Sequence, residues 1–157
     1  MPCIAPPPPQ VAAIIQVGPA PAYPLTFRAA DAASANYLVN PAGDWDFSCF
    51  KGPIKVRLTI STPGVVFYYG GGKDSLSFAY DSTQTKQPVQ AGHHQFPGNM
   101  QHVTAQAMWF KYANGWDCGA GDNQRRCERS AYGVYLGDAA GGFMAHADPI
   151  IQNGGSD

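Results

Sequence analysis

Two cysteines, Cys118 and Cys127, lie nine positions apart in the polar stretch formed by residues 117–130. None of the four cysteines belongs to a CxxC motif or to a Cys/His pattern with zinc spacing, so disulfide formation is favoured over metal binding. A Cys118–Cys127 disulfide would restrict the unfolded chain by about 2–3 kcal/mol; the alternative is a pair of free thiols. Cys3 and Cys49 are the possible second pair. Disulfides predict an oxidising compartment.

Three histidines, His93, His94 and His102, lie in or beside a long polar loop and are the candidate metal ligands. Neighbouring side chains point to opposite sides of an extended chain, so His93 and His94 cannot both bind one ion unless the chain bends. A metal site would also need His102 to fold back, with His146 or a carboxylate as a further ligand. A solvated loop is the favoured interpretation, and no cofactor is expected.

Paired carboxylates are the other candidate for chemistry, because glycoside hydrolysis needs two acids facing each other across a cleft. Asp44 and Asp46 are two positions apart and would share a face, and Asp117, Asp122 and Glu128 surround the cysteine loop. The chain has no Gly-x-Ser-x-Gly motif, no phosphate-binding loop before a helix and no His-Glu-x-x-His motif. These patterns predict a protein that is not an enzyme.

Aromatic residues are more numerous than one small core needs, and some must face outward from alternating strands. Flat rings beside polar side chains bind sugars or protein surfaces. Trp116 follows the Asn-Gly pair at 114–115 and is expected to be exposed, whereas Trp45 and Trp109 are expected in the core. The predicted ligand-binding residues are Trp116, Tyr112, Asp117, Asn123 and Arg125.

Length and composition predict one weakly charged folded domain. The 157 residues are 45% hydrophobic and 13% charged, with a formal net charge of −1. The ten Lys and Arg residues are spread along the chain and cluster only at Arg125, Arg126 and Arg129, which argues against nucleic-acid binding. No apolar run reaches 18 residues, so no membrane span is expected. The start lacks the pattern of a secretory signal, which indicates an intracellular chain or a removed signal.

Residues 1–24 contain eight prolines and are predicted to form an extended Pro-rich arm, followed by one domain at residues 25–157. The exception within the arm is the β-prone run VAAIIQV at residues 11–17. It would be an edge strand, a strand donated to a neighbouring molecule, or an ordinary first strand of the fold, and we favour the last.

Strand patterns dominate the rest of the chain. Residues 54–61, IKVRLTIS, alternate apolar and polar side chains, which predicts a strand with one buried and one wet face. Further strands are predicted within residues 65–70, 75–81, 102–112, 132–138 and 141–151, and one helix at residues 27–39. The pattern predicts an all-β fold, an antiparallel β-sandwich or jelly roll.

The segment YGVYLGDAAGGFMAHADPII, residues 132–151, has an alternating strand, an Asp and Gly turn, and a last strand that ends in Asp-Pro-aliphatic. The residues that fit this pattern are Val134, Leu136, Asp138, Gly141, Asp148, Pro149 and Ile150. The segment resembles the end of the AidA/PixA family of bacterial inclusion-body proteins. Ala147 stands where that family usually has an aromatic residue, the Pro-rich arm replaces its opening apolar strand, and the cysteines have no counterpart. The resemblance implies a β-sandwich that self-assembles or binds glycans.

These observations predict a non-catalytic β-sandwich module that presents aromatic and polar loop residues to a ligand such as a glycan or a protein surface. The alternative is a self-assembling structural protein, a virion, fibre or inclusion component, in which the arm at residues 1–24 holds a homo-oligomer together. A metalloprotein centred on the three loop histidines is the second alternative. We expect the protein to be secreted or on a cell or virion surface; a cytoplasmic inclusion is the alternative.

Overall fold

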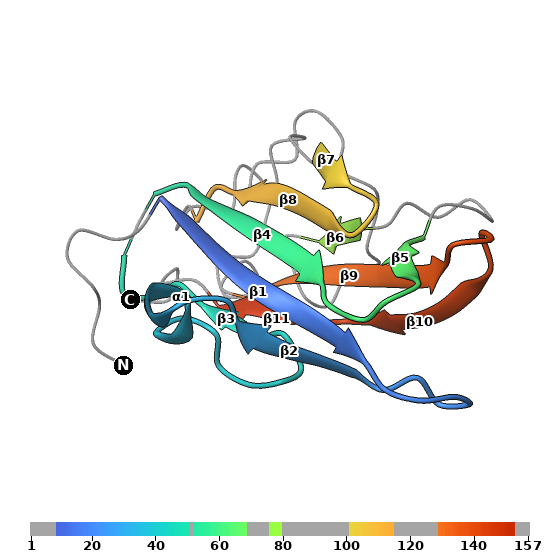
Figure 1. Cartoon of the computed structure of the whole chain (residues 1–157). Coiled ribbons are helices and arrows are strands. Elements are labelled where there is room, and N and C mark those ends of the chain that lie inside the picture. The colour runs from blue at the N-terminus through green and yellow to red at the C-terminus, as the bar shows by residue number, and fades with distance from the viewer. Residues whose placement is uncertain (1–8, 51, 69–75, 80–100, 115–128, 153–157) are drawn as a thin grey trace.

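Two β-sheets pack face to face in the computed structural model, which describes residues 9–50, 52–68, 76–79, 101–114 and 129–152 (Figure 1). Sheet A has the strand order β2-β1-β4-β8-β7, formed by Leu25–Ala29, Gln10–Val17, Ile54–Ile60, Ala107–Tyr112 and Gln101–Thr104. Sheet B contains β3 Trp45–Asp46, β5 Val65–Phe67, β6 Leu76–Ala79, β9 Arg129–Asp138, β10 Phe143–Ala147 and β11 Ile150–Gln152. The all-β sandwich is confirmed, but both sheets are mixed because β1 runs parallel to β4 and β11 runs parallel to β3.

Strand β1 lies inside sheet A, antiparallel to β2 on one side and parallel to β4 on the other. Its alternate residues Val11, Ala13, Ile15 and Val17 are buried. Residues 10–17 are therefore an ordinary strand of the fold, the interpretation favoured from the sequence, although they fall within the predicted arm. Residues 1–8 lie outside the described residues.

Strand β4 has the burial that its alternation predicts. Ile54, Val56, Leu58 and Ile60 are buried, and the residues between them are partly exposed on the outer face of sheet A. The same alternation in β8 turns Met108 and Phe110 inward, so Trp109 points outward and is half-buried. The prediction that Trp109 belongs to the core was wrong, because its two neighbours take the inward positions.

The helix predicted at residues 27–39 is mostly wrong. Phe27 pairs with Ile15 in the β1–β2 register and is buried, so this part of the segment is strand. Only α1, Ala32–Ala35, is helical, and the Asp31 carboxylate caps it by accepting a hydrogen bond of 2.7 Å from the Ser34 amide. Within the described residues no helix is long and apolar enough to cross a membrane.

Strand β9 is the central strand of sheet B. Along one edge it pairs with β10 and β11, and along the other with β5 and β6. Its inward residues Tyr132, Val134 and Leu136 are fully buried. Because four strands depend on β9 for their backbone hydrogen bonds, this strand sets the positions of all of them.

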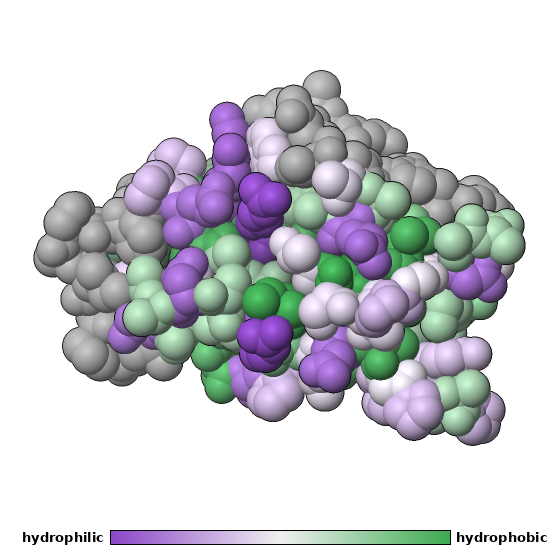
Figure 2. Space-filling view, in the orientation of Figure 1, coloured by the Kyte–Doolittle hydropathy of each residue, from purple (hydrophilic) through white to green (hydrophobic). Residues whose placement is uncertain are grey.

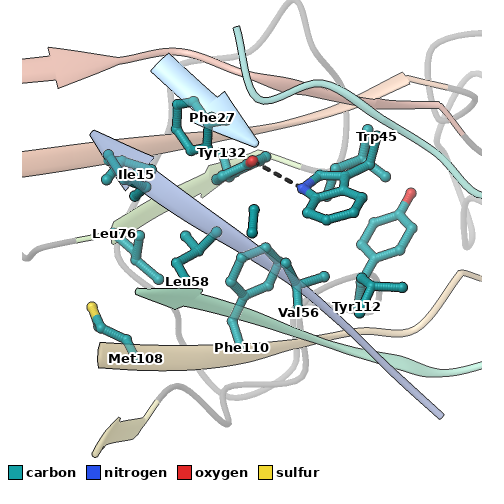
Figure 3. Close-up of a cluster of buried hydrophobic side chains, with 14 of the residues drawn as sticks. Ile15, Phe27, Trp45, Val56, Leu58, Leu76, Met108, Phe110, Tyr112 and Tyr132 are labelled. Carbon is teal, nitrogen blue, oxygen red and sulfur yellow. Dashed lines mark hydrogen bonds between the residues drawn. The ribbon is translucent and has the colours of Figure 1, made fainter. Parts of the chain in front are cut away.

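A chain of two buried hydrogen bonds joins β3, β9 and the loop before β3, and Figure 3 shows the one between Trp45 and Tyr132. The Trp45 indole Nε1–H donates to the Tyr132 hydroxyl over 3.0 Å, and that hydroxyl donates to the Gly43 carbonyl over 2.6 Å. Trp45 and Tyr132 are 1% and 0% exposed, so the core position predicted for Trp45 is confirmed. The hydroxyl satisfies two buried polar groups that have no access to water.

Replacing Tyr132 with Phe should lower the free energy of unfolding by about 1–3 kcal/mol, because the Trp45 N–H and the Gly43 carbonyl lose their partner while remaining buried. Urea denaturation measures the change. Tyr23→Phe is the control, because Tyr23 is only partly buried and makes no side-chain hydrogen bond to a described residue, so a change within about 0.5 kcal/mol is expected. Equal stability of the Tyr132→Phe variant and the wild type would contradict this role.

Burial raises the pKa of the Tyr132 hydroxyl far above the usual value for tyrosine, and the nearby Asp44 carboxylate raises it further, against a lowering by the hydrogen bond from Trp45. The unfolded chain releases this proton near pH 10 whereas the folded chain keeps it, so stability should fall as the pH rises above about 10. The slope from this one group approaches about 1.4 kcal/mol per pH unit. Denaturation of wild type and Tyr132→Phe between about pH 8 and 11 should show a shallower decline for the variant.

Candidate binding surface

Most residues singled out from the sequence lie outside the described residues: Cys3, His93, His94, Trp116, Asp117, Cys118, Asn123, Arg125 and Cys127. His102 lies in β7, and only the backbone of this residue is described. The predicted loop site around residue 116 and the Cys118–Cys127 pairing therefore stay predictions. Cys49 is disulfide-bonded, and its partner cysteine lies outside the described residues.

Tyr112, which the sequence predicted to contact a ligand, lies in the core. Its side chain is 0% exposed, and its hydroxyl forms a 2.9 Å hydrogen bond with the Ser130 hydroxyl. The ring packs 6.0 Å from that of Phe47, centroid to centroid. In β8 the outward position belongs to Lys111, so the alternation of the strand assigns Tyr112 to the core.

Asp44 and Asp46 line the same cavity of about 320 Å³. Both carboxylates, however, accept hydrogen bonds from neighbouring backbone amides and side chains. Asp44 accepts hydrogen bonds from the Ile150 amide over 2.8 Å and from the Asn40 side chain over 2.9 Å. Asp46 accepts from the amide and the hydroxyl of Ser48. These two acids stabilise the loop around β3, and no group of three or more His, Cys, Asp or Glu side chains within the described residues would hold a metal.

Four aromatic rings gather on the outer face of sheet B, and we call them the aromatic cluster: Tyr68, Tyr135, Phe143 and His146. The rings of Tyr135 and His146 are stacked, with centroids 5.7 Å apart and planes at 15°. The Phe143 ring meets the Tyr68 ring edge-on at 5.3 Å and lies 6.5 Å from His146. Phe143 is 48% exposed, so the cluster is open to solvent on at least one side.

The register of β9 and β10 positions this cluster. Tyr135 pairs with His146, and the neighbouring pair Leu136–Ala145 is buried, so Tyr135 and His146 point away from the core. The Tyr68 amide donates to the Tyr135 carbonyl over 2.9 Å, which brings the Tyr68 ring to the other edge of β9. Gly137 lies beneath that ring, and a Cβ atom there would be only 2.9 Å from the Tyr68 Cδ1 and 2.5 Å from the Gly142 carbonyl oxygen.

Polar groups adjoin the aromatic cluster. The His146 Nε2 lies 3.3 Å from an Asp148 carboxylate oxygen, and the two side chains are 49% and 54% exposed. A carboxylate accepts hydrogen bonds from hydroxyl groups, while ring faces contact apolar C–H surfaces. Together they have the properties of a surface that binds a molecule with both kinds of group.

The sequence analysis noted the excess of aromatic residues, but it did not identify this cluster. His146 was considered only as a metal ligand. The short DAAGG turn between β9 and β10 signals a hairpin, from which outward pairs can be worked out. Between Phe143 and Ala145, however, the pairing of β10 with β9 changes register. An irregularity of this kind cannot be predicted from the residues that form it.

Gly137→Ala should destabilise the protein by about 1–3 kcal/mol, because the added methyl group meets the Gly142 backbone and the Tyr68 ring. Phe143→Ala is the comparison, because Phe143 is half-exposed and its removal should cost less than about 1 kcal/mol. Thermal denaturation ranks the two variants. A Gly137→Ala variant as stable as the wild type would show that the close approach of Tyr68 and β10 to β9 is not required.

Comparison with known proteins leaves the chain without an assigned family. No family model matches it, and no curated protein is significantly similar to it. The function must therefore be inferred from the geometry of the chain itself.

Proposed function

We propose that this protein is a non-catalytic β-sandwich binding module whose aromatic cluster binds a glycan. The observation that carries the proposal is the gathering of four rings on the outer face of sheet B, with Phe143 48% exposed. Exposed apolar patches of this kind commonly mark a site that binds a ligand or another protein.

The arrangement of the rings suits a sugar. Tyr68 and Phe143 meet edge-on, and Tyr135 and His146 are stacked, so each ring is held by its neighbour before any ligand arrives. A surface that is ordered in advance loses little side-chain freedom on binding. The ring faces contact the C–H surface of a pyranose, and Asp148 accepts hydrogen bonds from its hydroxyl groups.

The loop residues predicted from the sequence, Trp116, Asp117, Asn123 and Arg125, belong to the same proposal as a second candidate contact. A Cys118–Cys127 disulfide would hold that loop. The disulfide at Cys49 favours an oxidising compartment, and hence a secreted or surface location.

Self-assembly is the alternative function, and the AidA/PixA resemblance of residues 132–151 implies it as well as glycan binding. The fold changes how the alternative is tested. Deletion of residues 1–24 would remove β1 from the interior of sheet A, so a truncation aimed at an intersubunit arm must stop before Gln10.

Phe143→Ala should weaken glycan binding about tenfold, since an aromatic contact contributes on the order of 0.5–1.5 kcal/mol beyond its buried area. The wild type is screened by NMR titration with neutral oligosaccharides of glucose, mannose, galactose and N-acetylglucosamine. Amide shifts are expected at Tyr135, Phe143 and His146. Val39→Ala is the matched control, because Val39 is 52% exposed and apolar but lines the separate cavity beside β3.

Two results would refute the aromatic cluster as the glycan site. Full affinity of Phe143→Ala together with loss of binding by Trp116→Ala would move the site to the loop. The second result combines two observations: no sugar shifts any amide signal, and light scattering shows oligomers in the wild type but monomers in Phe143→Ala. The cluster would then be a contact between copies of this chain.

A further inference from the structure

The four Lys and Arg side chains that the structure describes all lie on one surface, the outer face of sheet A: Arg28 on β2, Lys55 and Arg57 on β4, and Lys111 on β8. Strand alternation explains this placement. The residues that flank them, such as Phe27, Val56 and Phe110, are buried, so the cationic side chains point to solvent. Figure 2 views this face and shows strongly hydrophilic residues (purple) over β4 and β8.

The described acidic residues lie elsewhere. Asp31 caps α1, Asp44 and Asp46 hold the loop around β3, and Asp138 and Asp148 flank β10 in sheet B. Within the described part of the chain, none of the four cations forms an ion pair with a carboxylate. The described residues therefore give the outer face of sheet A a positive charge, although the whole chain has a net charge of −1.

Lys55 and Lys111 are directly opposite each other in the β4–β8 register. Like charges at such a cross-strand pair lower the stability of a sheet. The two lysines also line a hollow of about 270 Å³ with Pro9, Pro53 and Ile54. An anion in this hollow would lie beside both lysines and relieve their repulsion.

The cations follow a line across the sheet. Arg57 is two residues from Lys55 on β4, and its cross-strand neighbour on β1 is the small Ala12. Arg28 lies beyond β1, opposite Ile14. Adjacent strands are about 4.8 Å apart, so the line extends over several strand spacings, a length that suits an extended polymer better than a single small anion.

We propose that the outer face of sheet A binds a linear acidic polysaccharide, with carboxylate or sulfate groups on the four cations. Exposed or partly exposed Thr59, Thr26 and Gln16 lie on the same face beside Arg57 and Arg28 and suit sugar hydroxyls. Nucleic acid fits less well, because single strands bind through aromatic rings on which bases stack, and Trp109 has the Lys55 ammonium group 4.2 Å from its ring centre. This proposal does not depend on the aromatic cluster, which lies on the other sheet.

The experiment uses the full chain and polygalacturonate, titrated at low and moderate salt, with neutral dextran as the uncharged polymer. Polygalacturonate should shift the NMR amide signals of β2, β4 and β8 whereas dextran should not, and the affinity for polygalacturonate should fall by about tenfold or more between 50 and 200 mM salt because counterions are released on binding. Lys55→Gln combined with Lys111→Gln should weaken binding at least about tenfold. Ala139→Asp combined with Ala140→Asp makes the same change in net charge at the exposed turn between β9 and β10 of sheet B, and should change affinity less than about threefold.

In Phe143→Ala the shifts that polygalacturonate causes in β2, β4 and β8 should be the same as in the wild type, which separates this surface from the glycan site proposed above. Equal weakening by the two double variants would overturn the proposal, because binding would then follow net charge alone. Tighter binding of oligothymidylate with the same number of charges would overturn it in favour of nucleic acid. Oligomers that dissociate in Lys55→Gln/Lys111→Gln would identify the partner as a second copy of the chain.

Discussion

The hydrogen bonds of the Tyr132 hydroxyl are the constraint on which the arrangement of this sandwich depends. The hydroxyl accepts from Trp45 and donates to Gly43, and it lies in β9, the strand that pairs with four others. The Phe27 ring of sheet A packs against Gly43, where a Cβ atom would be 2.9 Å from the ring. One buried phenol therefore connects the centre of sheet B, the loop before β3 and an edge strand of sheet A.

Large aromatic rings fill the core between the two sheets. The outward residues take no part in this packing, so their chemistry can differ between sheet A and sheet B. On sheet B the β9–β10 hairpin and the end of β5 bring together the four rings of the aromatic cluster. On sheet A the alternation of β2, β4 and β8 places four cations outside. The two proposed surfaces belong to opposite sheets, so one molecule would present an aromatic and a basic surface at the same time.

Several features were predictable because they are local. The alternation of β4 predicted both its burial and its wet face, and the core position of Trp45 was predicted because an indole ring removes a large apolar area from water when it is buried. The helix prediction for residues 27–39 failed because cross-strand pairing of Phe27 with Ile15 outweighs the helix preference of an alanine-rich segment. Tyr112 and Trp109 were assigned to the wrong sides, since each assignment depends on which residues of β8 face the opposite sheet.

By itself the sequence determined the fold class, the strands with strong alternation and the low overall charge, because hydrophobic periodicity acts within a few residues. Only the tertiary structure decided which outward residues meet. Arg28 and Lys111 are far in the chain from Lys55 and Arg57, and all four come to lie on one face through the order β2-β1-β4-β8. Tyr68 reaches Phe143 across β9 over Gly137. Such contacts depend on strand order, register and a bulge, which are properties of the whole packed sheet and not of any one segment.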